Sequence, residues 1–281
     1  MQSNGKALCV GINKFQYLPP NAFLNGCVND AQDMSELLRT QLGFIKEDVT
    51  ILLDSKATKA NIMKNLKEIV QEANKGNCNY IVFSCSSHGS FMTDKNNDEP
   101  DHVDEVFCPY DTKGDDNGSW DPDHVIIDDE LRDLFAQLNS NVLLEAFLDT
   151  CHSGTGLRAL DLLMNRKIRF IPPPSAIAIN RGEGIRGHGM REALLEKDMK
   201  NHILWSGCKS DQTSADAIIE GQWHGAFTYY LNKFIKTQNK GMTRKGLITK
   251  VRKDLKTENY TQIPQLECDT KFNNLNIGRM S

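Results

Sequence analysis

This sequence is organised around Val142-Leu143-Leu144-Glu145-Ala146-Phe147-Leu148-Asp149-Thr150-Cys151-His152-Ser153-Gly154. The first seven residues are apolar except for Glu145, a pattern typical of a short strand buried on both faces of a sheet. The run stops abruptly at an acid, a thiol and a glycine. Ligands of open α/β sheets bind beyond the carboxyl ends of the strands, so we expect Cys151 to point into a cleft. The alternative is a core cysteine that closes a strand, since free cysteine is among the most buried residue types.

The same design recurs in Asn79-Tyr80-Ile81-Val82-Phe83-Ser84-Cys85-Ser86-Ser87-His88-Gly89, where an apolar strand ends in a histidine and a glycine. A cysteine attacks as the thiolate, and a nearby histidine stabilises the thiolate and then protonates the leaving amine. In a parallel sheet both strand ends lie at one edge, which predicts a dyad of Cys151 and His88. His152 is the competing base, but adjacent side chains diverge at a strand end. A purely structural role for His88 is the alternative.

The motifs Ser86-Ser87-His88-Gly89 and Asp149-Thr150-Cys151-His152-Ser153-Gly154 resemble the catalytic motifs of metacaspases, the caspase-like cysteine peptidases of plants, fungi, protists and bacteria. Further blocks match the family in its order: Lys6-Ala7-Leu8-Cys9-Val10-Gly11-Ile12-Asn13, Gly26-Cys27-Val28-Asn29-Asp30 and Ser206-Gly207-Cys208-Lys209-Ser210-Asp211-Gln212-Thr213-Ser214-Ala215-Asp216. The Gln-Ala-Cys signature of caspases is absent around Cys151, which argues against a true caspase. The resemblance implies a prokaryotic-type metacaspase, and we expect no prodomain before Lys6.

Strand and helix patterns alternate along the chain, which predicts an α/β fold with a mainly parallel sheet and helices on both faces. The resemblance narrows this prediction to a caspase-like fold with six strands. Expected strands cover 7–12, 49–53, 79–88, 142–148, 202–207 and 265–268. Expected helices cover 30–42, the segment after the capping Thr58, 129–138, the segment from Phe227 to Phe234 and the segment from Leu247 to Leu255.

The chain is expected to form a single caspase-like catalytic domain over 1–281, with a large part (1–163), a linker (164–200) and a small part (201–281). The linker lacks clear periodicity and contains Pro172-Pro173-Pro174, which is typical of a functional or flexible connection. It contains a set of basic residues: Arg166, Lys167, Arg169, Arg181, Arg186 and Arg191. Some metacaspases are cut in the corresponding segment, so we expect self-cleavage here without being able to select a bond. A solvated linker kept soluble by its arginines is the alternative.

Composition sets limits on the partners. The net charge of -4 gives no reason to expect nucleic-acid or anionic-membrane binding. The sequence shows neither a signal peptide nor an apolar run long enough for a membrane span, so we expect a soluble, cytoplasmic protein. Its eight cysteines lack CxxC spacing, which favours reduced thiols. The family tends toward monomers, and its partners would be protein or peptide substrates.

Two acidic residues indicate which substrate side chain this protein would bind. Asp149 lies two residues before Cys151 and therefore on the same face of the strand, and Asp30 begins a helix at the same sheet edge. Two carboxylates lining one pocket repel each other unless a cation lies between them, so we expect cleavage after Arg or Lys. The alternatives are a helix-dipole role for Asp30 and a carboxylate–histidine pair for Asp149.

The metacaspase resemblance adds to this pocket. It implies that residues at the positions of Asp30 and Asp149 build the acidic primary pocket, with contributions from Cys27 and Ser86. Asp211 is another acid that would face the substrate or brace a loop. The amides of Gly89 and Cys151 are candidates for stabilising the developing oxyanion. A glycine that simply ends a strand in a tight turn is the alternative for Gly89.

Acids are unusually dense between Asp94 and Asp129, and calcium binds six to eight hard oxygen ligands. The spacing does not fit an EF-hand. Many metacaspases require calcium, and the resemblance implies that Asp128 and Asp129 are ligands; our candidates from the first group are Asp101 and Asp104. Helix capping is the alternative for Asp128 and Asp129. The family also has an acid soon after the cysteine motif, where this chain has Arg158.

The sequence therefore predicts a cysteine endopeptidase that cleaves after Arg or Lys through Cys151 and His88, with calcium as its one expected cofactor. A peptidase preferring aspartate would need arginines where this chain has acids. The alternative from another class is an inactive caspase-like scaffold or binding module. A phosphatase is excluded because the Cys-x5-Arg loop is missing: Arg158 comes one residue late.

Overall fold

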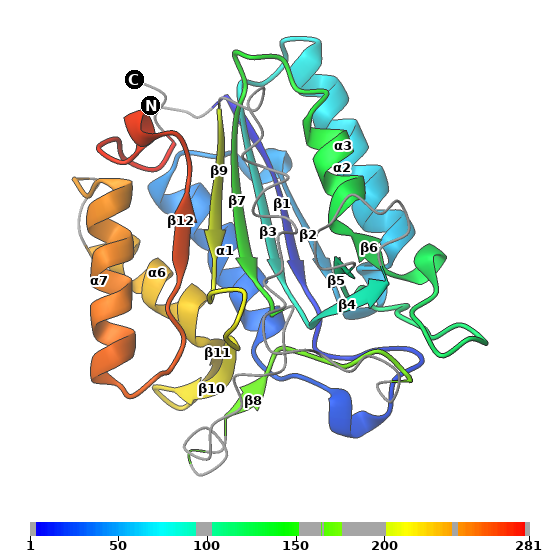
Figure 1. Ribbon diagram of the computed structural model, residues 1–281. Coiled ribbons are helices and arrows are strands. Elements are labelled where there is room, and N and C mark those ends of the chain that lie inside the picture. The colour runs from blue at the N-terminus through cyan, green and yellow to red at the C-terminus, as the bar shows by residue number, and fades with distance from the viewer. Residues whose placement is uncertain are drawn as a thin grey trace.

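A computed structural model describes residues 4–93, 103–151, 164, 166–175, 201–237 and 241–278. Its centre is a six-stranded sheet in the order β12-β9-β7-β3-β1-β2 (Figure 1). The strands are β1 (Gly5–Gly11), β2 (Val49–Leu53), β3 (Tyr80–Ser86), β7 (Leu143–Asp149), β9 (His202–Ser206) and β12 (Gln265–Glu267). Five are mutually parallel, and β12 runs antiparallel to β9. The predicted, mainly parallel sheet is confirmed.

Helices cover both faces of this sheet, as predicted (Figure 1). On one face lie α1 (Cys27–Gln41), α6 (Ala226–Thr237) and α7 (Arg244–Thr257), which share a hydrophobic cluster with Phe147 and Trp205. On the other face lie α2 (Lys59–Asn74) and α3 (Asp128–Phe135). Thr58 caps α2 by accepting a hydrogen bond from the Asn61 amide. No helix in the described parts of the chain has the length and apolarity that crossing a bilayer requires.

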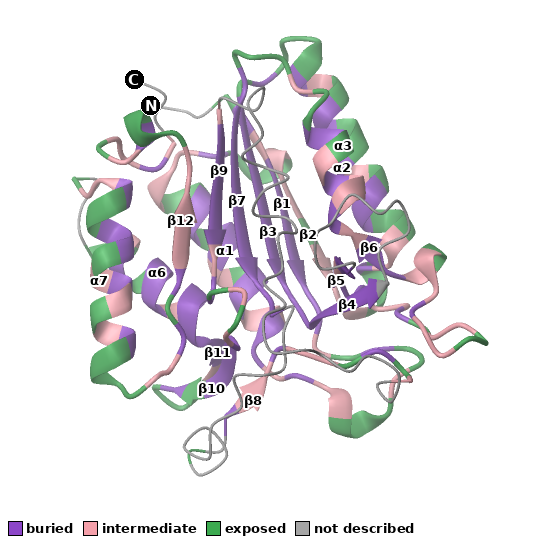
Figure 2. Ribbon diagram, viewed as in Figure 1, coloured by how far each residue is buried: buried purple, intermediate pink, exposed green. Residues whose placement is uncertain are grey.

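The two central strands explain why the apolar runs are continuous. All seven residues of β3 and all seven of β7 are buried, because helices exclude water from both faces (Figure 2). Glu145 and Asp149 are the charged residues among them, and the Glu145 carboxylate accepts hydrogen bonds from Arg244 Nε (2.8 Å), Trp205 Nε1 (3.0 Å) and Tyr80 Oη (3.0 Å). A buried charge requires such pairing, so the break in the apolar pattern is compensated.

Two small sheets lie at the carboxyl edge of the large sheet, and the sequence did not predict them. One contains β4 (Gly89–Thr93), β5 (Val103–Phe107) and β6 (Ile126–Ile127). The other contains β8 (Lys167–Ile168), β10 (Ala215–Ile219) and β11 (Gln222–Gly225). The β10–β11 turn uses Glu220 and Gly221, both at positive φ, in place of the Asn-Gly or Asp-Gly pairs that usually mark such hairpins.

The register of the strands determines where the histidine and cysteine motifs lie. Ser86, the last residue of β3, pairs with Asp149, the last residue of β7, and with Gly11 at the end of β1. His88 and Cys151 each follow two residues beyond these aligned ends. The two chemically active motifs therefore leave the sheet side by side at its carboxyl edge.

Candidate active site

One carbonyl oxygen joins the two motifs. The oxygen of Arg169 accepts hydrogen bonds from the Gly89 amide (2.9 Å) and the Cys151 amide (3.2 Å). The residues that follow the histidine strand and the cysteine strand thus converge on a single atom. Cys151 is fully buried and His88 is 4% exposed. The buried side chains lie beneath the segment that contains Arg169.

The imidazole of His88 is held in one orientation. Its Nε2 lies 2.7 Å from the Ala22 carbonyl oxygen, which can only accept, so Nε2 carries the proton. Its Nδ1 is buried and forms no hydrogen bond within the described residues. Burial lowers the pKa of His88 to about 4, while backbone groups of Ala22 and Arg169 oppose that shift. At neutral pH the ring is therefore neutral, with a free lone pair on Nδ1.

The sulfur of Cys151 has polar neighbours from the loop after β9. The Ser214 amide donates a hydrogen bond to it, and the Cys208 Sγ lies 3.8 Å away. The hydrogen bond to Cys151 and burial raise the pKa of the Cys208 thiol well above its usual value. Cys208 therefore stays protonated at neutral pH and donates toward the sulfur of Cys151.

Three carboxylates surround the guanidinium of Arg169, whose carbonyl oxygen joins the two motifs. Arg169 Nη2 lies 2.6 Å from Asp30 Oδ2 and 2.9 Å from Asp216 Oδ1, and Nη1 lies 3.2 Å from Asp149 Oδ2. The arginine side chain is 0% exposed and the three acids are at most 1% exposed. This fully desolvated cluster is the acidic pocket of the site, and a cation already occupies it.

Each of the three carboxylates also accepts hydrogen bonds from backbone amides or hydroxyl groups of other segments. The donors are the Gly225 amide for Asp30 (3.0 Å), the amides of Asn25 (2.8 Å) and Gly26 (3.0 Å) for Asp216, and the Ser214 hydroxyl, Thr228 amide (3.1 Å) and Thr228 hydroxyl (2.7 Å) for Asp149. These bonds fix the carboxylates before any guanidinium arrives. The pocket is therefore pre-organised for a planar group with several donors.

Glycine makes room for the guanidinium. A Cβ on Gly225 would overlap Asp149 Oδ2 and lie 2.5 Å from Arg169 Nη1. A Cβ on Gly26 would lie 2.6 Å from Asp216 Oδ1. Any side chain at these two positions would push into the acidic pocket, so the close approach of backbone to ligand requires glycine.

The two predicted acids of the pocket differ in their pKa. Burial raises the pKa of both carboxyls, and the Arg169 charge lowers it. At Asp30 that charge, with hydrogen bonds from His224, Arg169 and Gly225, outweighs burial, and the pKa lies below its usual value. At Asp149 burial outweighs the attraction to Arg169, and the pKa lies above its usual value. On acidification Asp149 is thus the first of the two to take up a proton.

The remaining predicted pocket residues lie at different depths. Cys27 begins α1, is fully buried, and lies close enough for the Arg169 charge to affect the pKa of its thiol, which burial raises. Ser86 is buried at the end of β3, opposite Asp149. Asp211 is exposed in the loop after β9. The acid of that block that contacts Arg169 is Asp216, which the sequence analysis did not select.

The structure describes three of the four predicted metal ligands. Asp101 lies outside the described residues. Asp104 in β5 is 3% exposed, and Asp128 at the start of α3 is 1% exposed. Asp129 is paired with Arg132 at 2.6 Å. Within the described residues no group of three or more His, Cys, Asp or Glu side chains is arranged to hold a metal ion.

The sequence analysis did not predict that Arg169 lies in the acidic pocket. Arg169 was grouped with the other basic residues of the linker, and a solvated linker was one interpretation, yet Arg169 is completely buried. The signal was its context: Ile168 precedes it, and Phe170 and Ile171 follow. A purely solvated segment has no need for three large apolar residues around one arginine.

Comparison with known proteins identifies the family of this chain. The family model of the caspase domain, Peptidase C14, matches residues 4–275. Metacaspase-1 of Botryotinia fuckeliana is 32% identical over 303 residues, an alignment that covers 95% of this chain and 68% of the relative. Metacaspase-1 of Emericella nidulans is 33% identical over 298 residues and is covered to 69% of its length.

Solved structures agree on the fold. The crystal structure of protein GSU0716 from Geobacter sulfurreducens superposes with a TM-score of 0.65 at 24% identity, covering 96% of each chain. Caspase-1 from Spodoptera frugiperda superposes with a TM-score of 0.59 at 14% identity, covering 95% of this chain and 87% of that one. The predicted caspase-like fold is confirmed. The chain belongs to the caspase-domain family of cysteine peptidases and, within that family, to the metacaspases.

Proposed function

We propose that this protein is an endopeptidase that cleaves after arginine through Cys151 and His88, and that its own segment 166–171 binds in the cleft as a substrate does. One observation carries the proposal. The side chain of Arg169 fills the acidic pocket while its carbonyl oxygen accepts hydrogen bonds from the amides of Cys151 and Gly89. A residue on the acyl side of a scissile bond must satisfy both conditions at once.

The backbone path of this segment supports the proposal. β8 pairs antiparallel with β10, and the Arg169 amide donates to the Ser214 carbonyl oxygen at 3.1 Å. Beyond Arg169, the Ile171 amide donates to the Gly89 carbonyl oxygen at 3.1 Å, and the ring of Phe170 stacks on Phe91 with centroids 6.1 Å apart. Main-chain bonds with pockets for side chains are how an extended peptide is recognised at a sheet edge.

The chemistry follows from these positions. Nδ1 of His88 takes the thiol proton, and Cys151 Sγ forms a bond to the carbonyl carbon of Arg169. The negative charge that develops on the carbonyl oxygen is stabilised by the amides of Gly89 and Cys151. The Arg169–Phe170 bond then breaks, and the nitrogen of Phe170 leaves with the proton from Nδ1. Water hydrolyses the thioester and releases Cys151.

Arginine suits the acidic pocket better than lysine. A guanidinium presents several donors in one plane, and two of its nitrogens contact three carboxylates here. An ammonium is a single point charge and would leave at least one of these buried carboxylates without its partner. An aspartate side chain would add a fourth negative charge. We therefore propose the order Arg, then Lys, with no cleavage after Asp.

The proposal assigns the self-cleavage bond that the sequence left open. The contacts of the Arg169 carbonyl oxygen with the amides of Cys151 and Gly89 support the choice of the Arg169–Phe170 bond, and a cut there would give fragments 1–169 and 170–281. Until residues 166–171 leave the cleft, they exclude other substrates. We further propose that the enzyme acts as a monomer, as the family resemblance implies.

Calcium activation is a separate proposal. Asp104 and Asp128 are buried carboxylates on segments that the β5–β6 pairing brings together through Val106 and Ile127, and they would supply hard oxygen ligands. A bound ion would order this layer, and no step of the peptide cleavage above depends on it. Calorimetric titration of the Cys151→Ala chain with calcium tests it: binding should weaken in Asp128→Asn, and equal affinity in both chains would exclude Asp128 as a ligand.

The proposed activity is tested with short reporter peptides that end in Arg, Lys or Asp. Wild type should release the reporter after Arg fastest and after Asp not at all, while Cys151→Ala should be inactive on all three. An inactive scaffold would leave every reporter intact, and a peptidyl thiol reagent would then fail to label Cys151. A preference for the Asp reporter would contradict the acidic pocket.

A further inference from the structure

A second arginine of segment 166–171 binds at a separate site. Arg166 lies three residues before Arg169 and is only 7% exposed. Its Nη1 donates to the Asn259 carbonyl oxygen (2.8 Å) and its Nη2 to the Glu258 carbonyl oxygen (3.0 Å). Its Cζ lies 3.7 Å from the centre of the Tyr260 ring. The Arg166 guanidinium is thus held by two hydrogen bonds and by a cation–π contact between its face and the tyrosine ring.

The partners of Arg166 come from the carboxyl end of α7. Glu258 is the residue that ends this helix, and Asn259 follows at a positive φ of 59°. Unpaired carbonyls and the negative end of the helix dipole gather at such a terminus, which favours a cation there. The ring of Tyr260 then offers its negative face to the guanidinium. The carboxyl end of α7 therefore forms a receptor for an arginine side chain, made of Tyr260 and the carbonyl oxygens of Glu258 and Asn259.

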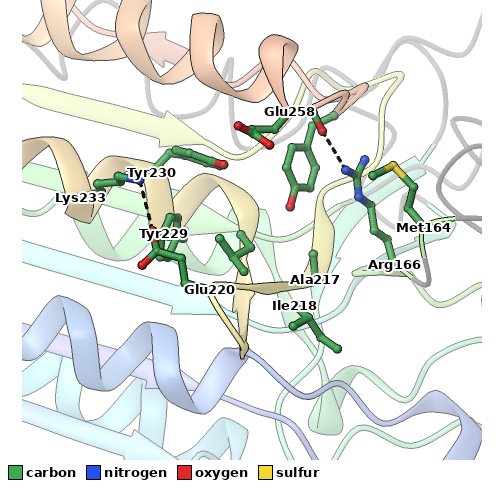
Figure 3. Close-up of a pocket in the computed structure, with 11 residues that line it drawn as sticks. Met164, Arg166, Ala217, Ile218, Glu220, Tyr229, Tyr230, Lys233 and Glu258 are labelled. Atoms are coloured by element: carbon green, nitrogen blue, oxygen red, sulfur yellow. Dashed lines mark hydrogen bonds and ion pairs between the residues drawn. The ribbon is translucent and has the colours of Figure 1, made fainter.

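This receptor borders a cavity of about 350 Å³. Figure 3 shows Arg166 at one side of the cavity, with its hydrogen bond to Glu258, while Tyr230 and the Tyr229–Glu220–Lys233 group lie on the other. The cavity lies next to the Arg166 side chain and offers space for further residues of a longer peptide.

The two arginines of the segment reach different parts of the fold. Side chains alternate along an extended strand, so positions three apart point to opposite sides. Arg169 enters the pocket between α1, β7 and β10, whereas Arg166 reaches the end of α7. Lys167, between them, makes a single hydrogen bond to the Phe23 carbonyl oxygen (2.7 Å).

We propose that Tyr260, together with the carbonyl oxygens of Glu258 and Asn259, is a second specificity site that selects arginine three residues before the cleaved arginine. This inference rests on the proposed function and names its substrate class: peptides with the pattern Arg-X-X-Arg. The site belongs to the small part of the chain and not to the segment, so it persists when residues 166–169 leave the cleft. Lysine could reach the carbonyls but lacks the planar face that stacks on the ring.

The test uses wild-type protein that has completed self-cleavage, with three reporters: Arg-Lys-Ile-Arg, Lys-Lys-Ile-Arg and Ala-Lys-Ile-Arg. We expect kcat/KM to be about tenfold higher for the first than for the last, a ratio consistent with one cation–π contact and two hydrogen bonds, with the lysine peptide between them. Tyr260→Leu should bring the Arg/Ala ratio close to one, and Tyr260→Phe, which keeps the ring, should preserve it.

Tyr229→Leu is the matched control, because Tyr229 lines the same cavity without stacking on Arg166, and its Arg/Ala ratio should equal that of wild type. Equal rates on all three reporters, or a ratio that survives Tyr260→Leu, would overturn the second site and leave cleavage after arginine intact. Failure to cleave any of the three would overturn both this site and the proposed function.

Discussion

The backbone amide of Cys151 donates a hydrogen bond to the carbonyl oxygen of Arg169 at 3.2 Å. The same Arg169 is fully buried among three carboxylates. The proposed nucleophile, Cys151, therefore contacts through its backbone the arginine that we propose precedes the attacked bond.

Asp216 should matter more than its sequence neighbour Asp211. Asp216→Asn removes one of the charges that hold an arginine side chain, and charged hydrogen bonds of this kind contribute about 1.5–3 kcal/mol. We expect KM for an Arg reporter to rise about 10- to 100-fold with a smaller change in kcat. The exposed Asp211 provides the control, and Asp211→Asn should behave like wild type. The reverse pattern would contradict the assignment of the pocket.

Gly225→Ala should close the acidic pocket. The added methyl group would lie 2.5 Å from the position of Arg169 Nη1 and would overlap Asp149 Oδ2. We expect at least a tenfold loss of kcat/KM on Arg reporters, while circular dichroism shows a folded protein. Unchanged kinetics with a folded variant would mean that the substrate side chain binds elsewhere.

Arg169 should contribute to stability as well as to cleavage. Arg169→Gln leaves three buried carboxylates without their cation, a change that typically costs about 3–5 kcal/mol. In the Cys151→Ala background, where no cut occurs, chemical denaturation should show a loss of that order. Arg169→Lys keeps the charge and should lose less. A stability equal to that of the parent chain in both variants would argue against a buried ion cluster.

His202 gives a pH dependence that is independent of the active site. Burial at the start of β9 lowers its pKa from 6.5 to about 4. Between these values the unfolded chain binds a proton that the folded chain does not, so the free energy of unfolding falls as the pH falls from 6.5 toward 4. His88 acts with the same sign.

His202→Leu tests this dependence. In the Cys151→Ala background, the variant should lose about 2 kcal/mol less stability than its parent between pH 7 and pH 4.5, measured by urea denaturation at both pH values. The comparison isolates His202, because His88 remains in both chains. A parallel decline of the two chains would show that folding does not lower the pKa of His202.

The sequence predicted the large sheet because its strands and helices have strong, separate periodicities. β3 and β7 are continuous apolar runs, and the α2 residues Ile62, Leu66 and Ile69 follow helical spacing. The two small sheets were missed for the opposite reason. β6 and β8 contain two residues each, too few for any periodicity to show.

The candidate site was predictable only where it depends on the large sheet. Side-chain alternation and strand order were enough to place Asp149 beside Cys151 and to bring Asp30 to the same edge. Asp216 lies in β10, outside that sheet, and its position depends on a hairpin whose turn has no usual signature. The burial of Arg169 depends on contacts with three distant segments, which the apolar residues next to it in the sequence do not identify.

The most direct test of the account is the intact mass of the purified chain after incubation. Wild type should separate into a fragment that ends at Arg169 and a fragment that begins at Phe170, while Cys151→Ala should keep its full mass under the same conditions. A cut at any other bond, or the same two fragments from Cys151→Ala, would contradict the claim that Arg169 lies in this active site as a substrate.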